Sequence, residues 1–292
     1  WSEYFGHHPQ DGSGDVYFNL DPLWSHPAVD AVGIDNYMPL SDWRDADYAG
    51  GNPDGFCGPY DPDGLKAAVA GGEGFDWYYP SAEARVARER APITDGAYAK
   101  PWTYRYKDIV SWWSNAHYDR VGGVQWPQPT GWVPYAKPVW LTELGCPAVD
   151  KGPNQPNIFP DPKSSESGAP YFSTGGRSDV AARRFLDAHL EHWDDAEPGF
   201  KESANPLSPV YGGRMLDVSR IYLWSWDARP FPAFPLRGNL WSDGSNWNLG
   251  HWLNGRLGSA DLGALINAIL ADHGQPPAGV DNADGTVQGY VL

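Results

Sequence analysis

Three short apolar runs, each ending in polar side chains and then proline or glycine, constrain the fold of this chain most strongly. They are residues 30–40 (DAVGIDNYMPL), 137–145 (KPVWLTELG) and 219–227 (SRIYLWSWD). Apolar runs of this length are typical of strands buried on both faces, as in parallel sheets. The breakers that follow, among them Pro39, Gly145 and Pro230, predict that each strand ends in a loop.

Helix-like segments lie between these runs. The clearest is residues 179–193, where apolar side chains recur near a 3.6-residue period and Asp179 is the expected N-cap. The side chains of this apolar stripe are Val180, Phe185, Leu186, Leu190 and Trp193. Further helices are expected at residues 83–90, 106–116 and 260–273. Strands alternating with helices predict an α/β fold with a parallel sheet wrapped by helices.

Long polar loops follow two of the predicted strands. Residues 41–64 and 147–178 are rich in Asp, Gly, Pro and Ser. Long ordered loops indicate a functional face, and a barrel carries its active-site loops at the strand ends. After residue 274 the chain reads as a linker entering a strand, VQGYVL. We therefore expect a barrel-like domain over residues 1–274, and a linker with the start of a following domain over residues 275–292.

Composition narrows the class of partner. The formal net charge of -16 would repel a phosphate backbone, which excludes nucleic acid. No apolar run approaches the roughly 20 residues that cross a bilayer, so no membrane span is expected. An aromatic content of 14%, with 16 Trp and 16 Tyr, suits either stacking on sugars or contact with proteins.

Both ends of the chain and its two cysteines carry further expectations. The chain begins at Trp1 without a signal peptide, which suggests a piece of a longer protein. Cys57 and Cys146 are too few for a disulfide framework, and their pairing stays open.

Glu143 is the strongest candidate for chemistry. Strict alternation along a strand puts Val139, Leu141 and Glu143 on one face, and Trp140, Thr142 and Leu144 on the other. A carboxylate at the end of a buried stripe is costly unless it has a partner or a function. A structural glutamate paired with arginine or capping a helix is the alternative. The position at a strand end favours catalysis, because barrel enzymes place their reactive groups there.

The other predicted site residues also stand at strand ends or in an aromatic stretch. Asp35, Asn36 and Tyr37 would hydrogen-bond substrate hydroxyls or the Glu143 carboxylate, with loop capping by Asx turns as the alternative. The other expected substrate-binding residues are Trp126, Trp224, Trp226 and Asp227. For Trp224 and Trp226, filling of the barrel interior is an equal alternative to a sugar platform. Trp112, Trp113 and residues 126–132 (WPQPTGW) are candidates for a stacking ledge, with aromatic packing under a long loop as the default.

Other catalytic classes lack their motifs. The chain has no GxSxG elbow, no HExxH and no P-loop. Residues 11–15 (DGSGD) imitate a calcium loop, but its twelfth position is Pro22 rather than glutamate. We expect neither a metal nor another cofactor.

Several long strings resemble the TIM-barrel-like domain of the gene transfer agent and phage tail family. They are WSEYFGHHPQDGSGDVYF, DAVGIDNYMPLSDW, GGEGFDWYY, KPVWLTELGCPAVDKGPNQPN and DPKSSES, spread over residues 1–275. More distantly, the pattern is similar to (β/α)8 glycoside hydrolases with one catalytic glutamate after strand four and another at the end of strand seven. The resemblance implies the C-terminal half of a TIM (β/α)8 barrel, strands five to eight, with long active-face loops.

In that comparison TELG places Glu143 at the strand-seven carboxylate, the nucleophile of a retaining mechanism. WSEYF would end strand five, IDNY strand six and LWSWD strand eight. The acid/base glutamate is then expected upstream of Trp1. Retaining hydrolysis requires two carboxyl groups roughly 5 Å apart.

Two hypotheses follow. In the first, the domain is a glycoside hydrolase of a tail-tip protein that cleaves cell-envelope polysaccharide or peptidoglycan glycan. In the second, it is a non-catalytic structural or receptor-binding module that holds a surface glycan or a neighbouring tail subunit. The resemblance also implies other tail or baseplate subunits as partners, and a virion-like particle assembled from proteins made in the bacterial cytoplasm.

Overall fold

A computed structural model describes residues 4–160 and 167–224 of the chain. The chain divides into two compact units. One comprises residues 1–157, 170–172 and 178–224, and the other residues 158–169, 173–177 and 225–292. The described helices and strands all belong to the first unit. The helix predicted at residues 260–273, the tail of residues 275–292, Trp226 and Asp227 lie outside the described residues.

The first unit contains short helices and strands joined by long loops. Its strands are β1 (Val32–Asn36), β2 (Trp77–Tyr78), β3 (Ala91–Pro92), β4 (Arg120–Val121), β5 (Val124–Gln125), β6 (Val139–Leu144) and β7 (Leu216–Leu223). Its helices are α1 (Asp21–Trp24), α2 (Asp47–Gly50), α3 (Pro62–Ala68), α4 (Ala82–Ala87), α5 (Ile109–Ser114) and α6 (Asp179–Trp193), with 3-10 turns η1 (Pro101–Tyr104) and η2 (Gly152–Asn154).

The three predicted strands form one parallel sheet in the order β1-β6-β7. Within the described residues this sheet is open rather than closed into a ring. The described part of the expected strand-five end does not join it, since Tyr4 and Phe5 lie in a turn. Gly6 follows with φ of +114°, a conformation that interrupts an extended strand. The structure thus has a parallel α/β sheet, but the half-barrel with strands five to eight is not confirmed.

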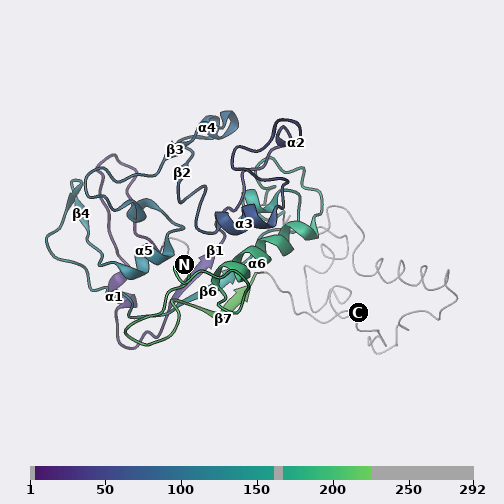
Figure 1. Cartoon of the computed structure of the whole chain (residues 1–292). Helices are drawn as coiled ribbons and strands as arrows, with labels where there is room; N and C mark the ends of the chain where they lie inside the picture. The colour runs from purple at the N-terminus through teal and green to yellow at the C-terminus, as the bar shows by residue number, and fades with distance from the viewer. Residues whose placement is uncertain (1–3, 161–166, 225–292) are drawn as a thin grey trace, which may run out of the picture. The chain divides into compact units, whose positions relative to one another are not determined.

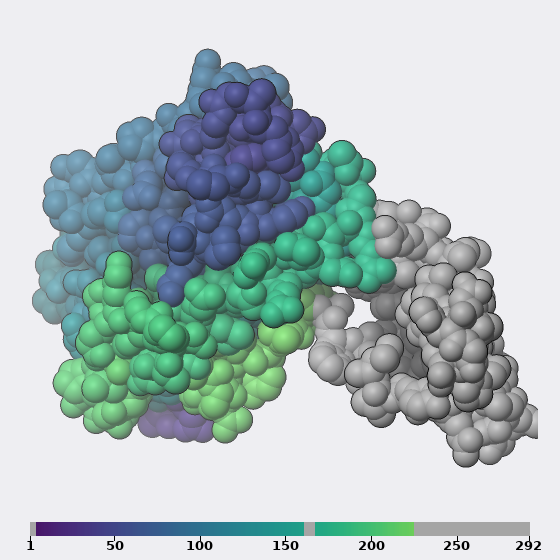
Figure 2. Space-filling model, turned by 45° about the vertical axis from the view of Figure 1, so that its right-hand side comes forward, coloured from purple at the N-terminus to yellow at the C-terminus, as the bar shows by residue number. Residues whose placement is uncertain are grey.

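The core lies between one face of this sheet and the helices. Val32 and Ile34 of β1, and Val139 and Leu141 of β6, are fully buried in one cluster with Phe185 of α6. Figure 1 shows α6 running across the sheet, with α3 beside it. In the space-filling view, the green band that holds α6 lies between the dark blue segment that holds α3 and the light green segment that leads into β7 (Figure 2). Helix α6 therefore packs on the apolar face of the sheet, and α3 packs against α6.

Helix α6 has the predicted bounds but a different buried face. Ser178, not Asp179, is the N-cap, and its side chain accepts a hydrogen bond from the backbone N–H of Ala181. Val180 and Leu190, predicted in the apolar stripe, are 52% and 40% exposed. The buried side chains are Ala181, Phe185, Ala188, His189 and Trp193. The small alanine side chains let the helix approach the core closely. The predicted stripe, which contained only large apolar side chains, left these alanines out.

Helix α3 was expected to be part of a loop. Asp61 accepts hydrogen bonds from the backbone N–H groups of Asp63 and Gly64, and Pro62 occupies the first helical turn. These are helix-start signals inside a segment whose many Asp, Gly and Pro residues indicated only a loop. Helices α4 and α5 are shorter than predicted, and Arg88 ends α4 in a left-handed conformation with φ of +59°.

Many of the aromatic side chains build the core. Trp112 and Trp113 are fully buried, and Trp132 is 3% exposed. The rings of Trp112 and Trp132 lie 4.7 Å apart, and those of Trp24 and Trp112 meet edge to face. For these tryptophans the packing alternative holds, rather than a ledge for sugars.

Two remaining expectations concern cysteines and membranes. Cys57 is exposed, Cys146 is buried, and both are free thiols. In the described part of the chain, none of the helices has the length and apolar character needed to cross a bilayer.

Candidate functional site at the carboxyl end of the parallel sheet

An irregularity in β6 positions Glu143. Ile34 of β1 pairs with Leu141, but the next residue, Asp35, pairs with Glu143. Thr142 is therefore an extra residue opposite β1, which is the arrangement of a β-bulge. A bulge changes the alternation of side chains, so Leu144 falls on the buried face with Leu141. The predicted assignment of Glu143 to the buried face and of Leu144 to the opposite face is wrong for this reason.

The bulge brings Glu143 to Tyr37. The Tyr37 hydroxyl donates a hydrogen bond of 2.5 Å to Oε2 of Glu143. Burial and the Glu143 carboxylate raise the pKa of Tyr37. The phenol consequently keeps its proton and acts as the donor in this hydrogen bond. This contact is one of the two that the sequence suggested for Tyr37.

A second carboxylate lies on the neighbouring strand. Asp35 stands at the register position of Glu143, and its Oδ1 accepts a 2.7 Å hydrogen bond from the Thr142 hydroxyl. Gly33 leaves room for this arrangement, since a Cβ there would lie 2.9 Å from the methyl carbon of Thr142. Thr142 was assigned to the face opposite Glu143, so sequence reasoning missed it.

Asn36 has a local structural role. Its side chain is 1% exposed, and its Oδ1 accepts a hydrogen bond of 3.1 Å from the backbone N–H of Met38. This is the Asx turn that the sequence offered as the alternative to substrate binding. Asn36 thus shapes the loop that leaves β1.

Trp224 stands next to this strand end. Its backbone N–H donates to the Leu144 carbonyl at 2.9 Å, and its side chain is 49% exposed. A Cβ on Gly145 would lie only 1.9 Å from the Trp224 carbonyl oxygen, so glycine is required where the two strand ends meet. The backbone of Trp224 thus adjoins the end of β6, and its side chain is exposed.

Trp126 lies elsewhere. It follows β5, and its backbone N–H donates to the Asp119 carbonyl. The β4–β5 hairpin is at the far side of this unit from β6 (Figure 1). Trp126 is 54% exposed, but the structure does not bring it to Glu143.

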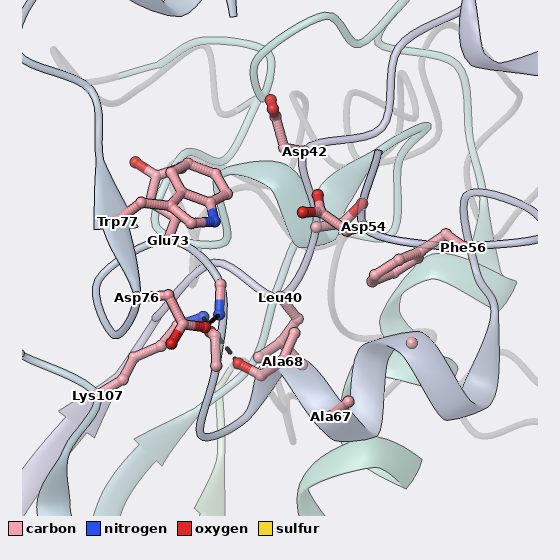
Figure 3. Close-up of a pocket in the computed structure, with 14 residues that line it drawn as sticks. Leu40, Asp42, Asp54, Phe56, Ala67, Ala68, Glu73, Asp76, Trp77 and Lys107 are labelled. Carbon is pink, nitrogen blue, oxygen red and sulfur yellow. Dashed lines mark hydrogen bonds between the residues drawn. The ribbon is translucent and has the colours of Figure 1, made fainter. Parts of the chain in front are cut away.

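A separate cavity of about 250 Å³ lies among the loops that follow β1. Leu40 and small residues of α3 form part of its lining, and Figure 3 shows Trp77 and Phe56 on opposite sides of it. Its charged lining residues are Asp42, Asp54, Glu73, Asp76 and Lys107. None of the predicted site residues that the structure describes lines this cavity. Much of its lining falls in the predicted loop of residues 41–64 and in the strings DAVGIDNYMPLSDW and GGEGFDWYY, so the sequence marked this region but did not show that Lys107 joins it.

Arginines neutralise most of the acidic wall. Asp42, with 2% of its side chain exposed, accepts hydrogen bonds from Arg88 and Arg90 and one of 2.5 Å from the Tyr79 hydroxyl. Arg90 also bridges both carboxylate oxygens of Asp54. Glu73 likewise accepts two hydrogen bonds, both from Arg85. Each guanidinium is held by planar, charge-assisted contacts, which makes this wall rigid.

The described residues form no group of three or more histidine, cysteine or acidic side chains able to hold a metal ion. At residues 11–15 the Asp11 side chain instead accepts a hydrogen bond from the backbone N–H of Ser13. The chemistry available at the sheet edge is thus that of carboxylates, a phenol and an exposed indole.

Comparison with known proteins identifies the family. No curated protein and no solved structure is significantly similar to this chain. A family model, the GTA TIM-barrel-like domain, matches residues 1–235. That match covers the whole sheet and both sites described above, and the chain belongs to the family of gene transfer agent TIM-barrel-like domains.

Proposed function

We propose that this domain acts as a glycoside hydrolase within the tail of a gene transfer agent or related phage-like particle. The substrate class is cell-envelope polysaccharide or peptidoglycan glycan. The observation that carries the proposal is the Tyr37–Glu143 hydrogen bond at the carboxyl end of a parallel sheet. Barrel enzymes place their reactive groups at this edge.

In this mechanism Glu143 is the nucleophile of a retaining reaction. Its ionised oxygen attacks the anomeric carbon, and a covalent glycosyl-enzyme forms that water then hydrolyses. Tyr37 donates a hydrogen bond to this carboxylate and so fixes the orientation of the attacking group. Thr142 and Asp35 hold the bulge that aims Glu143 at Tyr37. Trp224 supplies an apolar face for a sugar ring.

The proton for the leaving group requires a second carboxyl group. Asp35 is poorly suited to donate it, because its hydrogen bond from Thr142 favours the ionised form. We assign Asp35 to charge stabilisation and to hydrogen bonding of substrate hydroxyls. The group that donates this proton is not assigned among the described residues.

A second function is favoured by the same geometry. Both carboxylates that the described residues bring together at this edge accept hydrogen bonds from hydroxyl groups. Such a site can bind sugar hydroxyls without cleaving a glycosidic bond. The alternative is therefore a non-catalytic module of the tail that holds a glycan or receptor on the cell surface.

The two functions separate in one experiment. The complete native protein is incubated with purified peptidoglycan and capsular polysaccharide, and both reducing ends and bound protein are measured. If the domain is a hydrolase, Glu143→Gln lowers the rate of hydrolysis by at least about 1000-fold, since the nucleophile is lost, and leaves binding intact. Glu89→Gln, at an exposed residue of the same charge, is the matched control. Binding without release of reducing ends in the wild type supports the module, and neither binding nor hydrolysis refutes both functions.

A further inference from the structure

Lys107 lines the cavity among the loops after β1, and both hydrogen bonds of its side chain go to backbone carbonyl oxygens. The side chain is buried, with 1% of the residue exposed. Its Nζ donates to the carbonyl oxygens of Ala68, at 2.8 Å, and of Gly71, at 3.0 Å. In Figure 3 the side chain reaches toward Ala68, at the end of α3. Among the described residues, no carboxylate forms an ion pair with it.

Two acceptors match the neutral amine rather than the ammonium ion. An ammonium has three N–H donors, and the described protein atoms accept only two of them. A neutral amine has two N–H donors, both satisfied by these carbonyls, and one lone pair that stays free. Lysine used for covalent chemistry is activated in this way, by removal from water.

Electrostatics agree with the hydrogen-bond count. Burial lowers the pKa of Lys107 to about 7, although Glu73, Asp76 and Asp54 act in the opposite direction. His189 of α6 interacts electrostatically with Lys107, and burial keeps this histidine neutral by lowering its pKa to about 3. At neutral pH a substantial fraction of Lys107 is therefore uncharged.

We propose that Lys107 is a nucleophilic amine at the wall of this cavity and forms a reversible imine with small hydroxyaldehydes. The cavity volume of about 250 Å³ admits only small molecules. The carboxylates of Asp42, Asp54 and Glu73 accept hydrogen bonds from arginine. Each carboxylate has further lone pairs that can accept hydrogen bonds from the hydroxyl groups of a ligand. The negative charge of Asp76, which accepts a hydrogen bond from the Gly72 backbone N–H rather than from an arginine, disfavours an anionic aldehyde. The selected class is thus an uncharged aldehyde with hydroxyl groups.

The reaction needs no external oxidant or reductant. The Nζ lone pair attacks the carbonyl carbon and gives a carbinolamine. Both N–H protons of the amine then leave with the former carbonyl oxygen as water, and a C=N bond remains. This chemistry is independent of Glu143 and of the proposed hydrolysis.

Reductive trapping on the full chain tests the proposal without any substitution. The protein is treated at neutral pH with glycolaldehyde and cyanoborohydride, whose hydride reduces the imine to a stable secondary amine, and the modified lysines are identified by peptide mass spectrometry. Lys66, on α3, is the internal control, because it is 26% exposed at its side chain and paired with Glu191. We expect Lys107 to react at least about tenfold faster than Lys66, because a larger fraction of it is uncharged.

Two further measurements test whether the faster reaction of Lys107 comes from its folded environment. In denaturant the two lysines should react equally, and as pH rises the Lys107 rate should level off while that of Lys66 continues to climb. Glyoxylate, an anionic aldehyde, should modify Lys107 more slowly than glycolaldehyde does, whereas the two aldehydes should not differ in this way at Lys66. A folded-state rate at Lys107 equal to or below that of Lys66 overturns the proposal. If the ratio of the glyoxylate rate to the glycolaldehyde rate is the same at Lys107 as at Lys66, the assigned ligand class is overturned.

Discussion

Asp42 is the residue on which the charged wall of the cavity depends, and its replacement by asparagine provides a quantitative test. Its carboxylate lies 2.9 Å from a guanidinium nitrogen of Arg90 and 3.3 Å from Nε of Arg88. Arg44 approaches to 3.5 Å, and the Tyr79 hydroxyl donates at 2.5 Å. Only 2% of the Asp42 side chain is exposed. Water therefore cannot replace these contacts.

The expected cost follows from what the partners retain. Removing one member of a buried ion pair costs about 3 to 5 kcal/mol, since the remaining charge stays buried without compensation. Arg88 keeps Asp47, at 2.7 Å, and Arg90 keeps Asp54, at 2.6 Å. Because both guanidinium groups keep another carboxylate, we expect the lower end of this range for Asp42→Asn, about 3 kcal/mol.

Urea denaturation followed by far-UV circular dichroism measures this loss as a change in the free energy of unfolding. Glu89→Gln removes a carboxylate from an exposed position and should change stability by less than about 0.5 kcal/mol. A loss below about 1 kcal/mol for Asp42→Asn would refute the reasoning, because it would mean that the guanidinium groups do not depend on Asp42.

Two further predictions concern acid stability and the junction of β6 with β7. For Asp47, burial opposes ionisation, but hydrogen bonds led by that from Arg88 outweigh it and lower its pKa to about 2. Its stabilising contribution is therefore complete above the ordinary pKa of 3.8 and is lost as pH falls toward 2. The stability difference between wild type and Asp47→Asn should shrink by roughly 2 kcal/mol over that range, and a constant difference would contradict the ion pair. Gly145→Ala should cost about 1 to 3 kcal/mol by denaturation, because its Cβ meets the Trp224 carbonyl at 1.9 Å. Gly50→Ala, with no atom within 4 Å of its Cβ, is the control, and equal effects of the two substitutions would contradict the close approach.

Local sequence patterns determined the regular elements. The three apolar runs became β1, β6 and β7, and α6 spans the predicted residues 179–193. These elements depend on side chains close together in the chain, such as the 3.6-residue period and the caps. The gene transfer agent family was likewise readable from long strings of residues, and the family match over residues 1–235 confirms it.

The face on which Glu143 lies was decided by strand pairing. Its sequence position implied the face of Val139 and Leu141, because alternation is the default for a strand. The pairing with β1 contains one extra residue at Thr142, which reverses the alternation and leaves Leu144 buried. A bulge is a property of two strands together, so one strand's sequence does not reveal it.

The cavity shows the same limit more strongly. Lys107 reaches carbonyl groups 39 and 36 residues earlier in the chain, and Asp42 collects arginines more than 40 residues later. Each residue alone is an ordinary charged side chain of a polar loop. Their burial, and with it the uncharged amine and the rigid acidic wall, exists only when the folded loops exclude water. The sequence by itself determined the strands, the long helix and the family, while tertiary packing decided which charged groups meet and what chemistry they can perform.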